Sequence, residues 1–206
     1  MSDVYESYRN GYNGHSAIVL VTAPTVEPVT LAEAKLHCRV DHTDDNDLIT
    51  SLIVAARQLC EVKTEHSCVN TTWDLYLDFL PVRIYIPRSP LSSVTSLSYY
   101  ATDGTLTVMS SSDYVVDTAS APGRITQAST AVWPATQERT GAVIVRFVAG
   151  YGAAASSVPD SIKAAIKLLV GHWYENRESV VVGTITSELP MAVESLLAAN
   201  AVVTMV

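Results

Sequence analysis

The first cluster of residues that could do chemistry contains two closely spaced glycines. The sequence from Gly150 to Ala155 follows an apolar run and matches the dinucleotide-binding pattern G-x-G-x-x-A. That pattern binds pyrophosphate where a helix begins at the glycines. Here Ser156, Ser157 and Pro159 follow the motif, so the helix is expected to begin several residues after the glycines and not at them. We therefore interpret the segment as a loop between a strand and a helix.

Acidic and sulfur-bearing side chains suggest two candidate metal sites. The run from Asp41 to Asp47 resembles the start of a calcium loop, but its sixth and twelfth positions are Asn46 and Leu52 instead of Gly and Glu. Helix capping explains these acids better. A zinc site would draw on Cys and His residues with no C-x-x-C pair among them; they are His37, Cys38, His42, Cys60, His66 and Cys68. We predict no metal, no cofactor and, from the odd cysteine count, no complete disulfide set.

His172 is the most suggestive catalytic candidate, with Glu175 and Glu178 one and two helical turns away. The sequence has no G-x-S-x-G elbow and no cysteine with an obvious histidine partner. We predict that the protein is not an enzyme. A small hydrolase or deaminase that uses His172 with Glu175 stays as an alternative.

Composition narrows the function classes further. Of 206 residues, 48% are hydrophobic and 17% charged, and 21 acids against 13 bases give a formal charge of −8. Nucleic-acid binding draws on Lys and Arg, so this balance disfavours it. The apolar run from Ala17 to Ala23 is shorter than the ~20 residues of a membrane helix. We expect a soluble protein with some surface buried against other subunits.

The elements that would position these residues follow an α+β pattern. Residues 1–28 show neither a helical nor a strand period and read as a flexible arm, whose Tyr5, Tyr8 and Tyr12 could order on a partner. A capping box at Thr30 and Glu33 predicts a helix to about Val40. A second helix should end near Thr64, with one apolar face made of Leu48, Leu52, Ala55, Leu59 and Val62.

Strand signals begin at Thr72, where apolar and polar residues alternate. Six or seven short strands follow up to residue 149, including a hairpin that turns at Asp103-Gly104. These strands predict an antiparallel sheet or barrel inserted into a small helical bundle.

A long helix returns after Pro159, with Ile162, Ile166, Leu169 and Trp173 on one stripe. With Leu52, Leu59 and Trp73, these residues are the expected core. Pro190 opens a short last helix, and the chain closes with an apolar segment that carries no charge. We expect residues 29–71, 72–149 and 150–188 to form one compact domain and residues 189–206 to bind a partner.

The ordered series of motifs resembles the gp6-like head–tail connector proteins of tailed phages, also called adaptors or head completion proteins. The resemblance begins with Glu27 to Lys35, the acidic turn and the second helix. It continues through Ile86 to Leu91 and Asp113 to Asp117, and ends with Val148 to Gly152 and the helix that follows.

The resemblance implies a ring of about twelve copies at the neck of the virion, assembled in the host cytoplasm. Such a ring joins the portal protein to a stopper or tail-completion protein and extends the channel through which DNA passes without sequence-specific binding. A further implied role is portal binding by the C-terminal segment, through Leu189, Met191, Val193, Leu196, Leu197, Val202, Val203 and Met205. Another neck component, such as a stopper or tail-completion protein, is the first alternative.

Overall fold

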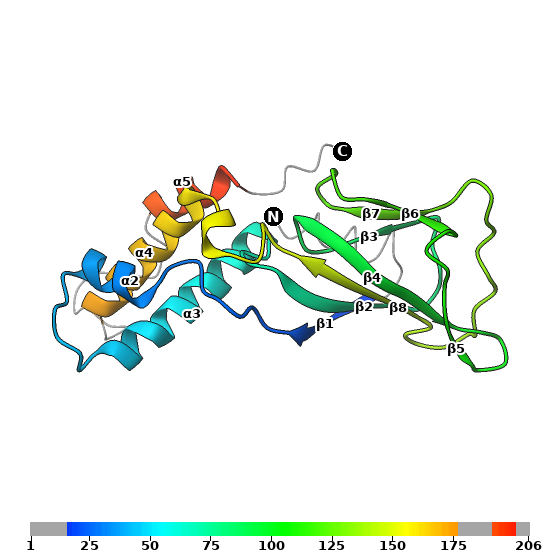
Figure 1. Cartoon of the computed structure of the whole chain (residues 1–206), viewed down its shortest axis with the longest axis horizontal. Coiled ribbons are helices and arrows are strands. Elements are labelled where there is room, and N and C mark those ends of the chain that lie inside the picture. Colours follow the sequence, from blue (N-terminus) through cyan, green and yellow to red (C-terminus); the bar gives the residue numbers. More distant parts are fainter. Residues whose placement is uncertain (1–15, 177–190, 201–206) are drawn as a thin grey trace. The chain divides into compact units, whose positions relative to one another are not determined.

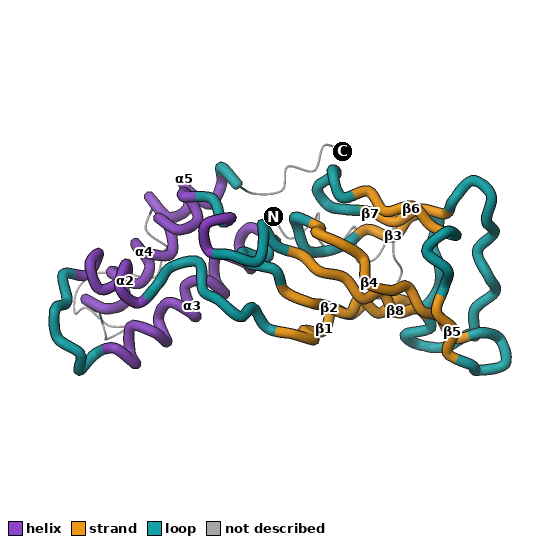
Figure 2. Tube along the Cα trace, in the orientation of Figure 1, coloured by secondary structure: helices purple, strands orange, loops and turns teal. Residues whose placement is uncertain are grey.

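The computed structural model describes residues 16–176 and 191–200, which divide into two compact units. The helical unit comprises residues 25–69 and the described part of 151–202, and the sheet unit comprises 16–24 and 70–150. Figures 1 and 2 show helices confined to the first unit and strands to the second. We expected one compact domain for residues 29–188, and in the described ranges the helices and the strands each have a hydrophobic core.

The helical unit contains four α-helices in the described ranges: α2 (Leu31–Cys38), α3 (Asn46–Thr64), α4 (Asp160–Glu175) and α5 (Met191–Ala198). The predicted capping box is confirmed. Thr30 Oγ1 accepts a hydrogen bond from the Glu33 amide at 3.2 Å, and Glu33 Oε2 accepts one from the Thr30 amide at 2.8 Å. Helix α4 packs against the other three helices.

The buried stripe of α3 differs from the predicted apolar face. It contains Ile49, Ile53, Ala56 and Cys60, one residue along from the expected positions. Leu52 and Leu59 are partly buried beside this stripe, whereas Ala55 and Val62 are exposed. The shift arises because the buried side of α3 also carries charged residues, which the hydrophobic pattern assigned to solvent.

The sheet unit contains two antiparallel sheets. The larger has the order β1-β2-β8-β4-β5 and the smaller the order β3-β7-β6. The strands are β1 (Ser16–Thr22), β2 (Thr71–Leu77), β3 (Arg83–Tyr85), β4 (Leu91–Tyr100), β5 (Leu106–Val108), β6 (Tyr114–Asp117), β7 (Arg124–Gln127) and β8 (Val143–Ala149). Both sheets are open, so the prediction of a sheet is confirmed and its barrel alternative is not supported.

One hydrophobic core lies between the two sheets. Leu75, Val145 and Phe147 from the larger sheet and Ile84 and Ile125 from the smaller are each no more than 1% exposed and belong to one cluster. The predicted hairpin turn is confirmed as well. Gly104 has φ +87°, a conformation that favours glycine, and its amide donates to the Ala101 carbonyl at 2.8 Å.

Strand β1 is absent from our sequence prediction, which placed residues 16–22 in the flexible arm. It pairs with β2 from Ser16↔Leu77 onward, with a register shift between Leu20 and Thr22. In the described ranges, no helix is both long and apolar enough to span a membrane.

Candidate interaction surfaces

Helix α4 supplies the centre of the helical core, as the sequence predicted. Ile162, Ile166 and Leu169 are each at most 1% exposed. Trp173, one turn further on, is only partly buried at the border of the same cluster. Gly171 lets α2 approach this helix, because a Cβ added there would lie 3.3 Å from the His37 ring.

Trp73 belongs to the other core. It lies on β2, partly buried against the cluster between the sheets. The Arg88 guanidinium stands 5.1 Å from the ring centroid, a cation–π distance. The expected core residues therefore divide between the two units.

Helix α5 contains four of the residues expected to bind a portal, and the structure changes their assignment. Val193 and Leu197 are buried in the helical core at 0% and 5% exposure, and Leu196 is partly buried against it. Met191 is 84% exposed. Val193 and Leu197 therefore hold α5 to the helical core, and of the four residues on this helix Met191 is the most exposed.

The end of α5 is also held by hydrogen bonds. Asn200 Nδ2 donates to Ser161 Oγ at 2.7 Å and to the Leu196 carbonyl at 3.0 Å. The other expected partner-binding residues lie outside the described ranges; they are Leu189, Val202, Val203 and Met205, with Tyr5, Tyr8 and Tyr12 of the arm.

A buried ion network stabilises the helical unit. Arg57, 7% exposed, donates to Glu27 Oε2 at 2.7 Å and to Glu61 Oε2 at 2.9 Å. Glu61 Oε1 accepts the Cys68 amide at 2.9 Å. Hydrogen bonds and charge from Glu27 and Glu61 raise the pKa of Arg57 against the opposing effect of burial, which is the largest single influence. The network joins three separate stretches of chain.

The three cysteines are free thiols that are buried or partly buried. Cys60 and Cys68 are fully buried, and Cys38 is partly buried. Burial raises the pKa of all three thiols, that of Cys60 to about 12. A thiol at such a pKa stays protonated at neutral pH and is a poor nucleophile or metal ligand. Throughout residues 16–176 and 191–200, no group of three or more His, Cys, Asp or Glu side chains is placed to hold a metal ion.

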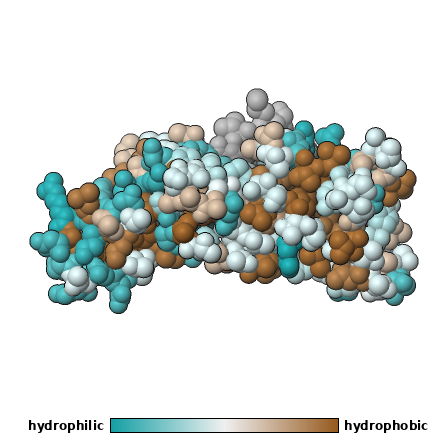
Figure 3. All heavy atoms as spheres, in the orientation of Figure 1, coloured by the Kyte–Doolittle hydropathy of each residue, from teal (hydrophilic) through white to brown (hydrophobic). Residues whose placement is uncertain are grey.

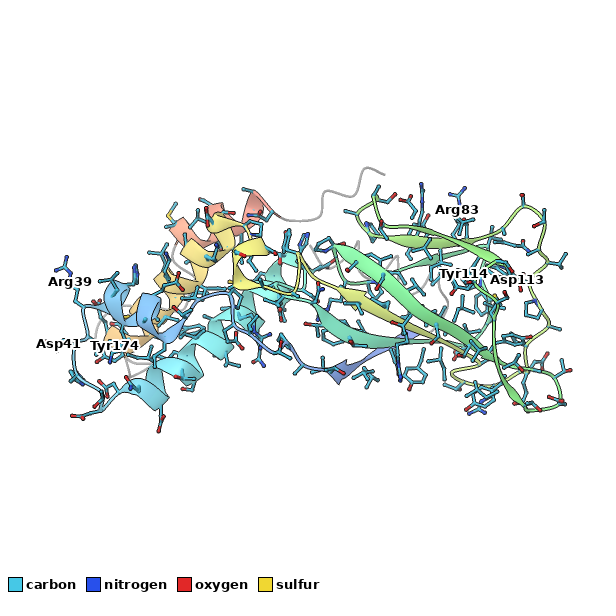
Figure 4. All side chains as sticks on the ribbon, in the orientation of Figure 1. Arg39, Asp41, Arg83, Asp113, Tyr114 and Tyr174 are labelled. Carbon is cyan, nitrogen blue, oxygen red and sulfur yellow. The ribbon has the colours of Figure 1, made fainter. Side chains whose placement is uncertain are left out.

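The acidic turn before α3 is built differently from the capping that we predicted. Asp45 occupies the N-cap position, but its side chain makes no capping hydrogen bond. Its carboxylate instead accepts the Tyr174 hydroxyl from α4, and Lys35 Nζ donates to Asn46 Oδ1 at 2.9 Å. Arg39, at the left-handed end of α2, points away from the helices (Figure 4).

The candidate catalytic residues show no catalytic arrangement. The His172 ring nitrogen Nδ1 lies 3.4 Å from Asn176 Nδ2, and Glu175 is exposed at the end of α4. The Gly150–Ala155 segment is a loop, as predicted, followed by a 3-10 turn at Ala155–Ser157 and only then by α4. Glu178 lies outside the described residues.

Exposed apolar side chains are numerous in the sheet unit. Figure 3 shows them as brown areas on the face of that unit turned toward the viewer. The exposed side chains of β1 were not predicted, although the uncharged apolar run from Ala17 to Val21 is visible in the sequence. The large apolar side chains at least 39% exposed in this unit are Val19, Leu20, Val21, Phe79, Val82, Leu106, Val108, Val115 and Val132.

The fold recurs in solved particles. A chain described as "Neck of empty GTA particle computed with C6 symmetry" matches 92% of this chain and 97% of its own length, with TM-score 0.75 and 24% identity. A chain of "Virion of native gene transfer agent (GTA) particle" gives TM-score 0.75 and 22% identity at the same coverage, and one of "Neck of native GTA particle computed with C12 symmetry" gives 0.69 and 24%. At this identity the likeness shows a shared fold.

The family assignment comes from a sequence model. Residues 28–120 match the family described as "Phage gp6-like head-tail connector protein". The resemblance found in the sequence is thereby confirmed, and the match covers the segment that contains α2, α3 and β2 to β6. No curated protein matches the chain.

Proposed function

We propose that this protein is a structural component of a virion neck, an adaptor that joins the portal to the tail and performs no catalysis. The match of residues 28–120 to the gp6-like connector family carries the proposal. The likeness to chains from two GTA necks over 92% of the sequence supports it.

The adaptor assembles as a ring of about twelve copies. A head-to-tail contact between identical copies forms a closed ring when the rotation from one copy to the next divides a full turn evenly. The C6 and C12 descriptions of the similar necks support cyclic symmetry. A formal charge of −8 suits a conduit, because a negative wall repels DNA and allows it to pass without adhesion.

The portal-binding surface in this proposal is the C-terminal segment, with revised anchors. Met191 is 84% exposed, whereas Val193 and Leu197 are buried in the helical core and cannot contact a partner. The anchors are therefore Leu189, Met191, Val202, Val203 and Met205, with Leu196 at the margin. An uncharged apolar chain end on an acidic protein gains most by burial against a partner.

Truncation tests this surface. Deleting residues 201–206 removes the apolar end and keeps Asn200, whose side chain ties α5 to α4. We expect affinity for the cognate portal to fall at least about tenfold, or ~1.4 kcal/mol, with the unfolding midpoint unchanged. The matched control replaces the six residues by Gly and Ser of equal length, and it should behave like the deletion.

Equal portal affinity for the truncated and intact chains would contradict the assignment of the portal surface. If the intact chain binds the tail-side neck protein and not the portal, the chain is another neck component, such as a stopper or tail-completion protein. The eight strands of the sheet unit are the observation that favours this second candidate.

A further inference from the structure

Strand β1 is an edge strand without the usual protection. Among the described residues it pairs only with β2, which leaves its other side open. Its residues Ala17 to Val21 are all apolar, and Val19 and Leu20 are 48% and 49% exposed. Natural edge strands carry charged residues, proline or a cover that prevents pairing with other chains. Strand β1 has neither a charge nor a proline, and its single device is the register shift near Thr22.

The opposite edge of the same sheet is also apolar and open. Within residues 16–176 and 191–200, strand β5 pairs only with β4, and its Leu106 and Val108 side chains are 50% and 67% exposed. The Met109 amide donates to the Leu97 carbonyl, and the Ala101 amide to the Thr105 carbonyl. Antiparallel bonding alternates along a strand, so the backbone groups of Leu106 and Val108 point to the outer side.

Val19 of one edge and Leu106 and Val108 of the other lie on one face of the sheet, whereas Leu20 lies on the opposite face. Register partners run across all five strands as Ala17↔Tyr76↔Ile144↔Ser98↔Val108. Cross-strand partners share a face. Val19 and Leu106 lie two residues from the ends of this row, so they share its face as well.

The two edges also run in the same direction. Every neighbouring pair in the order β1-β2-β8-β4-β5 is antiparallel. Strand direction therefore alternates across the five strands, and β1 and β5 run in the same direction. Copies related by rotation about one axis would therefore bring β5 of one beside β1 of the next as parallel strands. Each pair leaves another β1 and another β5 open, so the contact can continue around a ring.

We propose that the open edge of β1 binds the β5 edge of a second copy of this chain, so that the larger sheets of neighbouring copies join head to tail. This inference deepens the proposed adaptor ring and rests on it. Pairing of β1 with β1 of another copy would be antiparallel and would end at a dimer, because it uses up the same edge on both partners.

Charge exchange at the two edges tests the pairing. Val19→Lys and Val108→Glu each place one charge on an exposed side chain, so neither should change the fold. In sedimentation velocity on the full chain over a concentration series, we expect each single variant to weaken self-association about tenfold, or ~1.4 kcal/mol. The double variant carries opposite charges on the two mating edges and should recover most of the loss. Val132→Lys, on a loop side chain that is 88% exposed, is the matched control and should associate like the parent.

Each other result overturns the inference. If Val19→Lys weakens association and the double variant does not recover it, β1 mates with something other than β5. Association unaffected by either single variant would assign the contact to another surface. An intact chain that stays monomeric at its highest soluble concentration would also reject edge pairing. These results leave portal binding, which the truncation measures separately, as the test of the adaptor role.

Discussion

The two units differ in where their ion pairs and their exposed apolar side chains lie. In the helical unit, the buried Arg57 and Glu61 form an ion network with Glu27, whose side chain is 28% exposed. Loss of one member of this ion network would leave the remaining charges buried without their partner. The sheet unit exposes apolar side chains, with Val19, Leu106 and Val108 about half exposed or more along its open edges. This arrangement leaves apolar area that only another molecule can cover. This difference is the basis of the proposed pairing between the sheet edges of neighbouring copies.

Breaking the ion network should produce the largest effect. Arg57→Met leaves two carboxylates beside each other without their cation, and removal of one partner from a buried ion pair costs about 3–5 kcal/mol. We expect this loss in denaturant unfolding followed by helix circular dichroism. Arg124→Met is the comparison in the sheet unit, where Arg124 pairs with Asp117 and the two side chains are 41% and 30% exposed. A loss for Arg124→Met as large as that for Arg57→Met would contradict the idea that burial of the ion pair determines the cost.

Trp173 tests where the helical core ends. The ring is partly buried at the border of the cluster, so Trp173→Ala should cost about 2 kcal/mol, against about 4 kcal/mol for Ile166→Ala at full burial. The measurement is the free energy of unfolding for both variants under one protocol. A near-neutral Trp173→Ala would assign the ring to an interface with another molecule, and a cost equal to that of Ile166→Ala would place it in the core.

The smallest effect concerns acid stability of the small sheet. The Ser120 hydroxyl donates to Asp117 Oδ2 at 2.6 Å, and this bond, with two backbone amides and Arg124, lowers the pKa of Asp117 to about 2. A carboxyl whose folded pKa is lowered stabilises the fold above its unfolded pKa of 3.8, and loses that contribution as pH falls toward about 2. We expect the intact chain to lose thermal stability over that interval and Asp117→Asn to lose less.

Ser120→Ala is the matched variant for this measurement, because it removes the largest cause and keeps the carboxyl. It should raise the pKa of Asp117 in an NMR titration of the carboxyl carbon. An unchanged titration would mean that the backbone amides and Arg124 alone hold the pKa down.

Local signals predicted most elements. The capping box at Thr30, the turn at Gly104 and the alternation along β2 each depend on a few neighbouring residues, and each is confirmed. The buried face of α3 was misassigned because Arg57 and Glu61 occupy positions that a hydrophobic pattern assigns to water. Their burial depends on Glu27 and on the Cys68 amide, partners remote in sequence.

Strand β1 was missed for the opposite reason. Residues Ala17 to Val21 are all apolar, so they lack the alternation of apolar and polar residues by which the other strands were predicted. Both faces of an edge strand can be apolar when another chain covers the exposed face. Among the candidate binding residues, the sequence could not separate Met191 from Val193 and Leu197, since all are apolar and only their packing against α4 distinguishes them.

The helical unit is interrupted in sequence between Cys68 and Tyr151, yet the Tyr151 amide donates to the Cys68 carbonyl at 3.4 Å. Just beyond, Thr71 and Ala149 are register partners on β2 and β8. The roughly eighty residues between Cys68 and Tyr151 therefore form an insertion whose first and last residues lie close together. A segment whose two ends lie together can be inserted between two helices without separating them, which is why insertions at such places are tolerated.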